Sequence, residues 1–185
     1  MLYGLPSSLT LPELKGVAHL ESKGNYAIKR YYQWPFSFFY QHKLKMVLDL
    51  MDKPYYHNIL DFGAGPGIFN ETLKRKATHV VEYDIDKPIK EHSSFELIIC
   101  ASVLEFIQFL DGQCKILNKK LTNGGKIIVA SPMNTLATRT YFNLIGDKHK
   151  RNSHETILST LSQNFFLEEY HTWLGIYFSA RLRKL

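Results

Sequence analysis

Three glycines at alternate positions stand in the stretch ILDFGAGPGIF, at Gly63, Gly65 and Gly67. An apolar run and an aspartate precede them, and residues with helical spacing follow. Glycine has no Cβ and adopts positive φ readily, so a loop of this kind lets the backbone approach a ligand closely. Nicotinamide dinucleotides, nucleotide phosphates and adenosyl sulfonium cofactors all bind glycine-rich loops in this setting, and the loop alone does not distinguish them.

The spacing of the glycines differs from that of the phosphate-binding motifs. A dinucleotide fingerprint would place a glycine where this chain has Ile68, and no Gly-Lys-Ser/Thr sequence of a P-loop follows. The last glycine of that fingerprint lets a helix N-terminus approach a pyrophosphate, which a ligand without phosphates does not require. Asp84 ends the next apolar segment, where a carboxylate can accept both hydroxyls of a ribose. The alternative for Asp84 is a turn or helix-capping residue.

The elements that would position these residues alternate between strands and helices. Apolar residues at helical spacing predict a helix over residues 36–51, with Gln41, Lys43, Lys45 and Asp49 expected on its polar side. This alternation predicts an α/β fold, a doubly wound, Rossmann-like sheet that is mostly parallel and has an antiparallel C-terminal strand. The other predicted elements are strands at 58–62, 80–83, 95–100 and 127–130, helices at 68–76, 103–121 and 157–165 (the last with a capping signal at Asn152 or Ser153), and closing strands at 166–173 and 176–182.

The composition is that of a soluble protein with one globular domain. Of the 185 residues, 45% are hydrophobic and 22% are charged. We divide the chain into an N-terminal arm or lid over residues 1–35 and a single domain over residues 36–185. Neither a secretory signal nor a transmembrane helix is expected. Cys100 and Cys114 lie in apolar segments and are expected in the core, which fits a reducing, cytoplasmic location.

The net charge of +6 and the pI near 9.2 leave two interpretations open. Basic residues gather at 115–126, 148–151 and 181–184, where they could face a nucleic acid or an anionic lipid surface. A solvated surface with a basic bias is the simpler interpretation. Charge alone therefore does not identify a partner.

Four segments, in order along the chain, resemble the class I S-adenosylmethionine-dependent methyltransferases, most closely the small-molecule type near the ubiquinone-biosynthesis methyltransferases. They are ILDFGAGPG, VVEYDID, FELIICASVLEFI and LNKKLTNGGKIIVASPMN, and the resemblance covers residues 55–175. It implies S-adenosylmethionine as the cofactor and S-adenosylhomocysteine as the product. The cofactor-binding residues that it implies are Asp61, Gly63, Ala64 and Gly65 at the methionine part, Asp84 at the ribose, Ile85 at the adenine, and Ala101, Ser102 and Val103 beside the sulfonium.

The chain departs from this family at two places. Only residues 85–94 separate the second and fourth strands of the family pattern, which is too short for the usual helix and third strand. That third strand is therefore expected to be reduced or missing, with the adenine partly uncovered or covered by residues 87–94. The histidine that usually follows Val-Leu-Glu in the family is Phe106 here.

No residue is identified as catalytic by a motif. His149 and His154 are candidates because they follow the last parallel strand, and Glu105 is a candidate because it opens a helix near the expected site. The alternatives are surface positions for the two histidines and a helix-dipole or capping role for Glu105. The eight histidines show no metal-ligand spacing, so no metal site is predicted.

The methyl acceptor is predicted only as a class. A small molecule is favoured, and the Asp/Asn-Pro-Pro-Tyr/Phe and Pro-Cys motifs of nucleic-acid methyltransferases are missing. The alternatives are an RNA or protein methyltransferase that uses the basic surface, and a non-catalytic module that retains the fold. The aromatic stretch at residues 30–43 is either a lid over an aromatic or lipophilic acceptor or part of the core. Residues 133–151 are the second place where acceptor specificity is expected.

Overall fold

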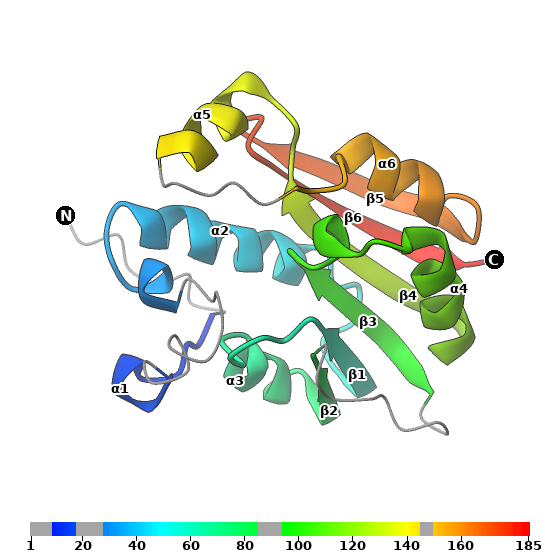
Figure 1. Ribbon diagram of the computed structural model, residues 1–185. Coiled ribbons are helices and arrows are strands. Elements are labelled where there is room, and N and C mark those ends of the chain that lie inside the picture. The colour runs from blue at the N-terminus through cyan, green and yellow to red at the C-terminus, as the bar shows by residue number, and fades with distance from the viewer. Residues whose placement is uncertain (1–8, 18–27, 85–93, 145–149) are drawn as a thin grey trace.

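The computed structural model describes residues 9–17, 28–84, 94–144 and 150–185, and a six-stranded sheet lies at its centre (Figure 1). The strand order is β2-β1-β3-β4-β6-β5. Strands β1 to β4 run parallel, β6 is antiparallel to β4, and β5 is antiparallel to β6, which confirms the predicted Rossmann-like sheet. The strands are β1 (Tyr56–Phe62), β2 (Ala77–Tyr83), β3 (Phe95–Ala101), β4 (Leu121–Pro132), β5 (Phe165–Trp173) and β6 (Tyr177–Lys184).

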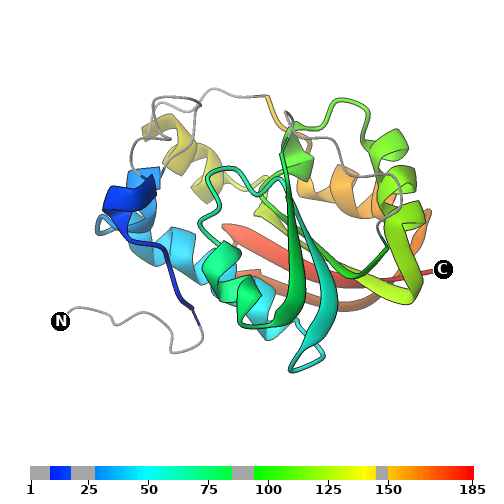
Figure 2. The same ribbon diagram turned by 90° about the horizontal axis from the view of Figure 1, so that it is seen from below.

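Helices cover both faces of the sheet (Figure 2). Because both faces are covered, the central strand β3 is almost wholly apolar, as a buried parallel strand must be. None of the helices in the described ranges is long and apolar enough to span a bilayer. One face carries α1 (Leu14–Val17), η2 (Ile28–Tyr31), α2 (Phe36–Asp49) and α3 (Asn70–Lys74), and the other carries α4 (Leu110–Lys120) and α6 (His154–Leu161).

Both cysteines lie in the core between the sheet and the α4–α6 layer. Cys100 and Cys114 are buried free thiols, so the predicted core role is confirmed. Burial raises the pKa of Cys100 well above its usual value and that of Cys114 to about 11. Thiols that stay protonated and buried are chemically inert.

The helix predicted over residues 103–121 is wrong at its beginning. Its first residues form a short 3-10 turn, η3 (Leu104–Phe106), and α4 starts only after a further loop. The reason is Asn152, whose side-chain amide donates hydrogen bonds to the carbonyls of Leu104, at 3.1 Å, and Ile107, at 2.7 Å. Asn152 thus occupies carbonyl groups that the first turn of a regular helix would use for its own amides.

Two other predicted boundaries differ from the structure, and one predicted cap is confirmed. The TNGGK stretch does not separate α4 from a later strand, because β4 begins at Leu121 and pairs with β3 through a register shift. Phe165 does not belong to the last helix but starts β5, where its ring is buried. Ser153 caps α6, since its hydroxyl accepts a hydrogen bond from the N–H of Thr156 at 3.2 Å.

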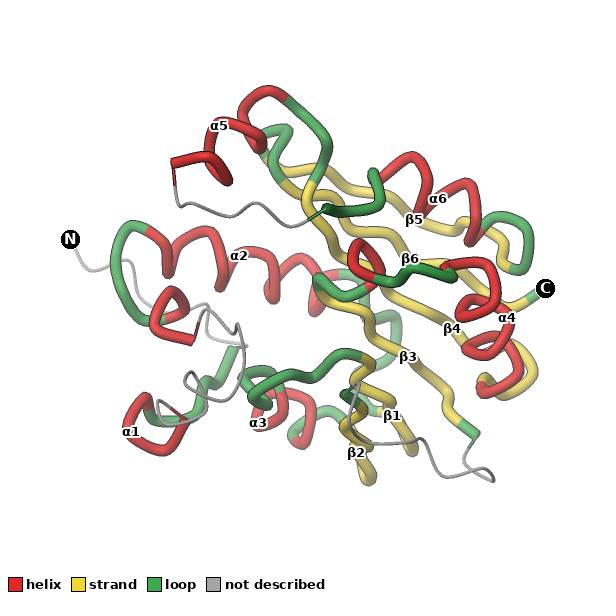
Figure 3. Tube along the Cα trace, in the orientation of Figure 1, coloured by secondary structure: helices red, strands yellow, loops and turns green. Residues whose placement is uncertain are grey.

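Because β1 to β4 run parallel, their C-terminal ends lie together and their N-terminal ends lie together. We call these two ends of the sheet the carboxyl edge and the amino edge. The four parallel strands all end at the carboxyl edge, where the loops after β1, β3 and β4 leave the sheet (Figure 3), and they all start at the amino edge. On one side the outermost strand of the described chain is β2. The predicted reduction of a third family strand concerns residues 85–93, which lie outside the described residues.

Candidate active site

The glycine loop leaves β1 at the carboxyl edge and is fixed on two sides. Its three glycines all have positive φ angles, between 53° and 81°. The N–H groups of Gly63 and Ala64 donate to the carbonyl of Tyr83, at 2.8 and 3.0 Å, which holds the loop against the end of β2. On the other side, a Cβ on Gly63 would lie 2.5 Å from the Cβ of Val103. No side chain fits at Gly63, and the loop therefore lies directly against two of the other predicted site segments.

The two predicted carboxylates flank this loop. Asp61 is only 3% exposed and lies opposite Glu82 in the β1–β2 pairing, while Asp84 follows the end of β2. Burial, followed by the carboxylates of Glu82 and Asp84, raises the pKa of Asp61 to about 7, and Lys43 acts in the opposite direction. A buried carboxyl group of this kind becomes a stable anion when a cationic group is placed beside it.

The residues that follow β3 are held in an unusual backbone conformation. Ser102 has φ of 60°, in the left-handed region that residues other than glycine rarely adopt. Its N–H donates to the carbonyl of Ala130 at 2.7 Å, which ties it to β4. Strained residues persist only where their surroundings hold them, and they cluster at ligand sites. The segment from Ala101 to Val103 lies directly against the glycine loop, since Val103 is the residue that a Cβ on Gly63 would meet.

Lys43 is a site residue that sequence reasoning missed. It was expected on the polar side of its helix, and this prediction is wrong, since Lys43 is 4% exposed. Positions 43, 47 and 50 follow the helical period and are all buried, and Leu44 and Met46 are the other buried residues of α2. The ammonium donates to the hydroxyl of Ser102 at 3.0 Å and to that of Tyr31 at 3.4 Å. A lysine at a position that the period assigns to the core was the signal in the sequence.

The ammonium of Lys43 has aromatic and hydroxyl neighbours but no carboxylate partner among the described residues. Its Nζ lies 5.7 Å from the ring centre of Tyr31 and 5.4 Å from that of Tyr40. Burial lowers the pKa of Lys43, but the two tyrosines and Glu105 more than offset this effect, so the pKa is raised and the group stays charged. Glu105 and Asp61 interact with this charge electrostatically, but no ion pair to it is found among the described residues. The side chain is therefore arranged to receive an anionic group of a ligand.

Glu105 is the catalytic candidate that the structure brings into this site. Its side chain is buried, and its Oε2 accepts a hydrogen bond from the hydroxyl of Ser131 at 2.5 Å. Burial raises the pKa of Glu105, while the bond from Ser131 and the charges of Lys43 and Arg151 act against this rise. Its backbone carbonyl accepts from the N–H of Asn152 at 2.7 Å. Glu105 is thus bound through both side chain and backbone, which suits a residue that positions the ends of β3 and β4.

Of the two histidine candidates, only His154 lies among the described residues. His149 lies outside the described residues, as does the predicted adenine contact Ile85. The Nδ1 atom of His154 accepts a hydrogen bond from the N–H of Asn134 at 3.2 Å, and its ring packs near Phe178 in the core. The same Nδ1 atom lies 3.1 Å from Oε2 of Glu155. His154 therefore connects the start of α6 to the end of β4.

Aromatic side chains fill the space between α2, α5 (Leu136–Leu144) and the end of β5. The ring of Phe39 lies 5.8 Å from that of Tyr141 and 5.6 Å from that of Trp173. His42 stacks on Trp173 at 4.1 Å, and burial lowers the pKa of this histidine, so it is neutral at pH 7. Part of the aromatic stretch at residues 30–43 therefore packs, half-buried, between α2, α5 and the last strands.

An arginine stands near the position where the family has its histidine. The guanidinium of Arg151 lies 4.0 Å from the ring centre of Phe142, on α5, and 5.2 Å from that of Phe106. A guanidinium over an aromatic ring is an attractive arrangement. Arg151 thereby connects the segment after α5 to the turn after β3, on the acceptor side of the carboxyl edge.

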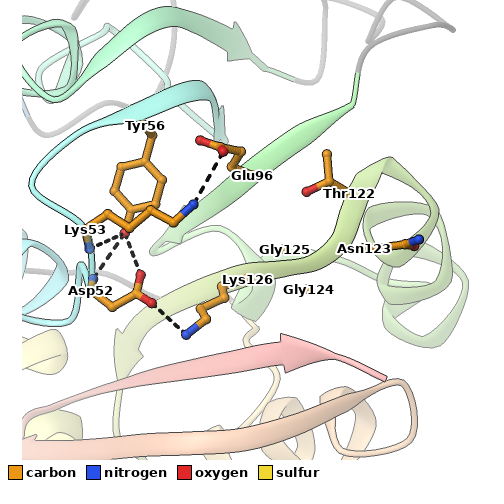
Figure 4. Close-up of a pocket in the computed structure, with 9 residues that line it drawn as sticks. All are labelled: Asp52, Lys53, Tyr56, Glu96, Thr122, Asn123, Gly124, Gly125 and Lys126. Carbon is orange, nitrogen blue, oxygen red and sulfur yellow. Dashed lines mark hydrogen bonds and ion pairs between the residues drawn. The ribbon is translucent and has the colours of Figure 1, made fainter.

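A hollow lies at the amino edge, at the opposite end of the sheet from the glycine loop (Figure 4). The hydroxyl of Tyr56 donates to Asp52 Oδ1 at 2.8 Å inside it. Its charged side chains are paired, Lys126 with Asp52 at 2.7 Å and Lys53 with Glu96 at 3.4 Å. Because these charges are satisfied within the protein, the hollow does not compete with the carboxyl edge as the site of chemistry.

Residues 26–170 match a protein family described as a methyltransferase domain. This match spans most of the chain, so the chain belongs to that family. It is an enzyme, a methyltransferase of class I that uses S-adenosylmethionine. The resemblance seen in the four sequence segments is thereby confirmed at the level of the class. A search among curated proteins finds no significant match.

Solved structures share this fold at low sequence identity. The N-methyltransferase NodS from Bradyrhizobium japonicum, in complex with S-adenosylhomocysteine, is 18% identical with a TM-score of 0.64, and the alignment covers 91% of this chain and 97% of NodS. A possible histamine N-methyltransferase from Thermotoga maritima is 15% identical with a TM-score of 0.60, covering 90% and 99%. A methyltransferase from Haloferax volcanii bound to its activator Trm112 is 10% identical with a TM-score of 0.65, covering 80% and 91%.

Proposed function

We propose that this methyltransferase transfers its methyl group to a small-molecule acceptor at the carboxyl edge of the sheet. One observation carries the proposal: the glycine loop, the end of β2 and the turn after β3 meet there, with the buried ammonium of Lys43 beside them. The edge thus offers a closely approachable backbone, carboxylates and one unpaired buried cation. These are the groups that an adenosyl amino acid needs.

The residues present fit S-adenosylmethionine in this arrangement. In the proposed site Asp61, Gly63, Ala64 and Gly65 hold the methionine part, and the positive φ angles of the glycines leave room for it. The amino group of the ligand supplies the cation that a buried Asp61 needs, and its carboxylate supplies the anion that Lys43 needs. The proposed contacts at the other end are Asp84 with the ribose hydroxyls, Ile85 with the adenine, and Ala101, Ser102 and Val103 beside the sulfonium.

When bound, S-adenosylmethionine supplies a methyl group that is already activated for an in-line displacement. The protein has to orient the acceptor and exclude water, which can provide most of the catalysis. In this proposal the aromatic side chains around Phe39 and Trp173 exclude water from the acceptor side. Glu105 acts as a positioning residue through Ser131, and a proton acceptor is needed only for an acceptor that is protonated at working pH.

The packing of aromatic rings at the carboxyl edge supports a small acceptor. The space between α2, α5 and β5 is occupied by rings in contact with one another, so the described residues leave no broad open groove there. Two of the similar structures are described as N-methyltransferases, one of them with a possible histamine acceptor. RNA or protein remains the alternative acceptor class, and salt-sensitive binding of RNA by the purified protein would favour it.

Calorimetric titration with S-adenosylhomocysteine tests the proposed site. Asp84→Ala should weaken binding about 10- to 100-fold, because hydrogen bonds to a charged group contribute roughly 1.5–3 kcal/mol. Asp111→Ala, which removes an exposed carboxylate on α4 paired with Lys115, is the matched control and should bind as the unmodified protein does. Equal affinity of the Asp84 variant and the unmodified protein would refute the ribose assignment. The division at residue 35 and the cytoplasmic location stay predictions.

A further inference from the structure

Large apolar side chains are exposed at one end of the carboxyl edge, on three different segments. The segments are the start of α2, the helix α5 and the turn between β5 and β6, which lie together at one end of the molecule (Figure 1). Apolar groups exposed together in this way mark an interaction surface. We call this surface the apolar platform, and it consists of Trp34 (80% exposed), Phe38 (42%), Leu136 (80%), Leu144 (82%) and Leu174 (69%).

The three segments are fixed to one another, so the apolar platform is one surface rather than three loose parts. The hydroxyl of Thr135, at the start of α5, donates to the carbonyl of Gly175 in the β5–β6 turn at 2.7 Å. Phe38 on α2 packs against Trp173 at the end of β5, with ring centres 5.4 Å apart. Two turns of α5 separate Leu136 from Leu144, which both lie on its outer face.

Leu174 is held in a conformation that its residue type disfavours. It has φ of 50° and is followed by Gly175 with φ of 63°, and the N–H of Ile176 donates to the carbonyl of Trp173 at 2.9 Å to close the turn. Two successive positive φ angles define the tight hairpin turn in which Asn-Gly is strongly preferred. A leucine at the first position is strained and also exposes a large apolar side chain. Neither effect helps folding, which points to a role in contact with a partner.

The described segments that form and adjoin the apolar platform are rich in basic residues. Residues 28–48, 133–144, 150–154 and 172–178 carry basic residues and contain no aspartate or glutamate. The carboxylates that follow these segments among the described residues are Asp49, paired with Lys45, and Glu155, which contacts His154 at 3.1 Å. A symmetric contact between two copies would bring these like charges against one another. An anionic lipid surface is complementary both to the basic charge and to exposed Trp, Phe and Leu side chains. The basic residues are Lys29, Arg30, Lys43, Lys45, Arg139, Lys150 and Arg151, of which Lys43 is buried.

We propose that the apolar platform docks the protein on an anionic lipid surface. The platform side chains enter the interfacial region of the bilayer, and the exposed lysines and arginines contact the lipid headgroups. Docking of this kind is peripheral and reversible, because single basic residues and single apolar side chains each add only modestly to the affinity. The inference does not depend on the proposed methyl acceptor.

Binding to vesicles tests this proposal with the full chain and without cofactor. We compare vesicles of phosphatidylcholine alone with vesicles that also contain phosphatidylglycerol, by co-sedimentation and by quenching of tryptophan fluorescence with brominated lipid. The chain has two tryptophans, Trp34 and Trp173, so Trp34→Phe should reduce the quenching to the part that comes from Trp173. Binding should require phosphatidylglycerol, and Arg139→Gln should weaken it about fivefold.

Leu174→Asn separates loss of docking from loss of folding. Asparagine suits the turn, so thermal unfolding should shift to higher temperature or stay unchanged, while partition to anionic vesicles should fall about tenfold. Ile116→Ser, which removes an exposed apolar side chain on α4, is the matched control and should leave partition unchanged. Calorimetry with S-adenosylhomocysteine should give the same affinity for Leu174→Asn as for the unmodified protein, so failure of docking is distinguishable from failure of the cofactor site.

Two results would overturn the proposal. One is the absence of binding to vesicles that contain phosphatidylglycerol, or equal binding of Leu174→Asn and the unmodified protein. The other is self-association in analytical ultracentrifugation that Leu174→Asn abolishes, which would assign the apolar platform to a second copy of this chain.

Discussion

The amino and carboxyl edges of the sheet hold their charges in opposite ways. At the amino edge Lys126 lies 2.7 Å from Asp52 and 2.8 Å from Glu168. Burial alone would raise the pKa of these two carboxyls, but the bonds from Lys126 hold both below their usual values. At the carboxyl edge Asp61 has its pKa raised to about 7, and Lys43 is buried with no carboxylate partner among the described residues.

This difference separates groups that stabilise the fold from groups that are arranged for a ligand. Charges at the amino edge find their partners within the protein and therefore contribute to its stability. Charges at the carboxyl edge are left incomplete at the place where ligands of open α/β sheets bind. A polar group with an unfavourable environment is thus more informative about function here than one with a full set of partners.

The largest effect is expected from a methyl group in the glycine loop. Gly63→Ala should lower the free energy of unfolding by more than about 3 kcal/mol, because the new Cβ would overlap Val103 and the residue has φ of 81°. Gly124→Ala is the matched change at the amino edge, where φ is 71° but nothing lies within 4 Å. It should cost only about 1–2 kcal/mol. Urea denaturation of both variants provides the measurement.

A second substitution shows whether overlap with Val103 causes the loss of stability in Gly63→Ala. Val103→Gly removes the atoms that the new methyl group would meet. Gly63→Ala should therefore lower the free energy of unfolding less in the Val103→Gly variant than in the unmodified protein. Equal losses for Gly63→Ala and Gly124→Ala would contradict the distinction between a crowded carboxyl edge and an open amino edge.

Removal of a lysine charge should act on different properties at the two edges. Lys43→Met should weaken S-adenosylhomocysteine binding about 100-fold, as expected for loss of a buried charge partner. Lys126→Met should leave binding unchanged and lower stability by about 1–2 kcal/mol, because Asp52 and Glu168 lose their partner. Calorimetry and urea denaturation measure the two properties. The comparison between the two edges fails if both variants have a lower free energy of unfolding and both keep the affinity for S-adenosylhomocysteine.

The pH dependence of stability should differ in the same way. Between its usual pKa of 3.8 and the raised value of about 7, folded Asp61 holds a proton that the unfolded chain has released. This group therefore destabilises the fold increasingly as the pH rises through that range. Asp61→Asn should raise stability by about 2–4 kcal/mol at pH 8 and by little near pH 4, while weakening cofactor binding. A gain of the same size at both pH values would argue against a buried, protonated Asp61.

The smallest effect is expected from a carboxylate at the amino edge. The pKa of Asp52 is lowered, so its contribution is present at neutral pH and is lost as the pH falls below its usual value of 3.8. Asp52→Asn should lower the free energy of unfolding by about 1 kcal/mol at pH 7, since the pair with Lys126 is partly exposed. Thermal unfolding should show the difference shrinking toward pH 3. A difference that grows in acid would contradict the ion pair.

Local patterns in the sequence were sufficient to predict most of the fold. The apolar run of β3 can only be a strand covered on both faces, and the alternate glycines after β1 need positive φ angles. The class of cofactor followed because four such segments stand in a fixed order. What failed was the beginning of the helix predicted after β3. Its carbonyls are taken by Asn152, a contact between residues far apart in the chain that no local pattern contains.

The candidate site was predicted less completely than the fold. One reason is that a charged residue was assigned to the surface by its type, although its place in the helical period indicates a buried position. Lys43 was assigned to the polar side of α2 for its charge, although its place in the helical period is that of a core residue. Glu105 could be named because it was expected to open a helix near the site, but its bond to Ser131 depends on how β3 and β4 lie side by side. The acceptor could be predicted only as a class, since the ring contacts near the carboxyl edge join α2, α5 and β5, which lie far apart in the sequence.

The connection between β4 and α6 is anchored at both of its ends. At its start, the N–H of Met133 donates to the carbonyl of Ile176 and Thr135 bonds to Gly175. At its end, Asn152 binds the turn after β3. Neither anchor uses a residue of the glycine loop. The sequence predicts acceptor specificity in residues 133–151, so we expect that grafting this connection into another methyltransferase of this fold would transfer acceptor preference without rebuilding the glycine loop.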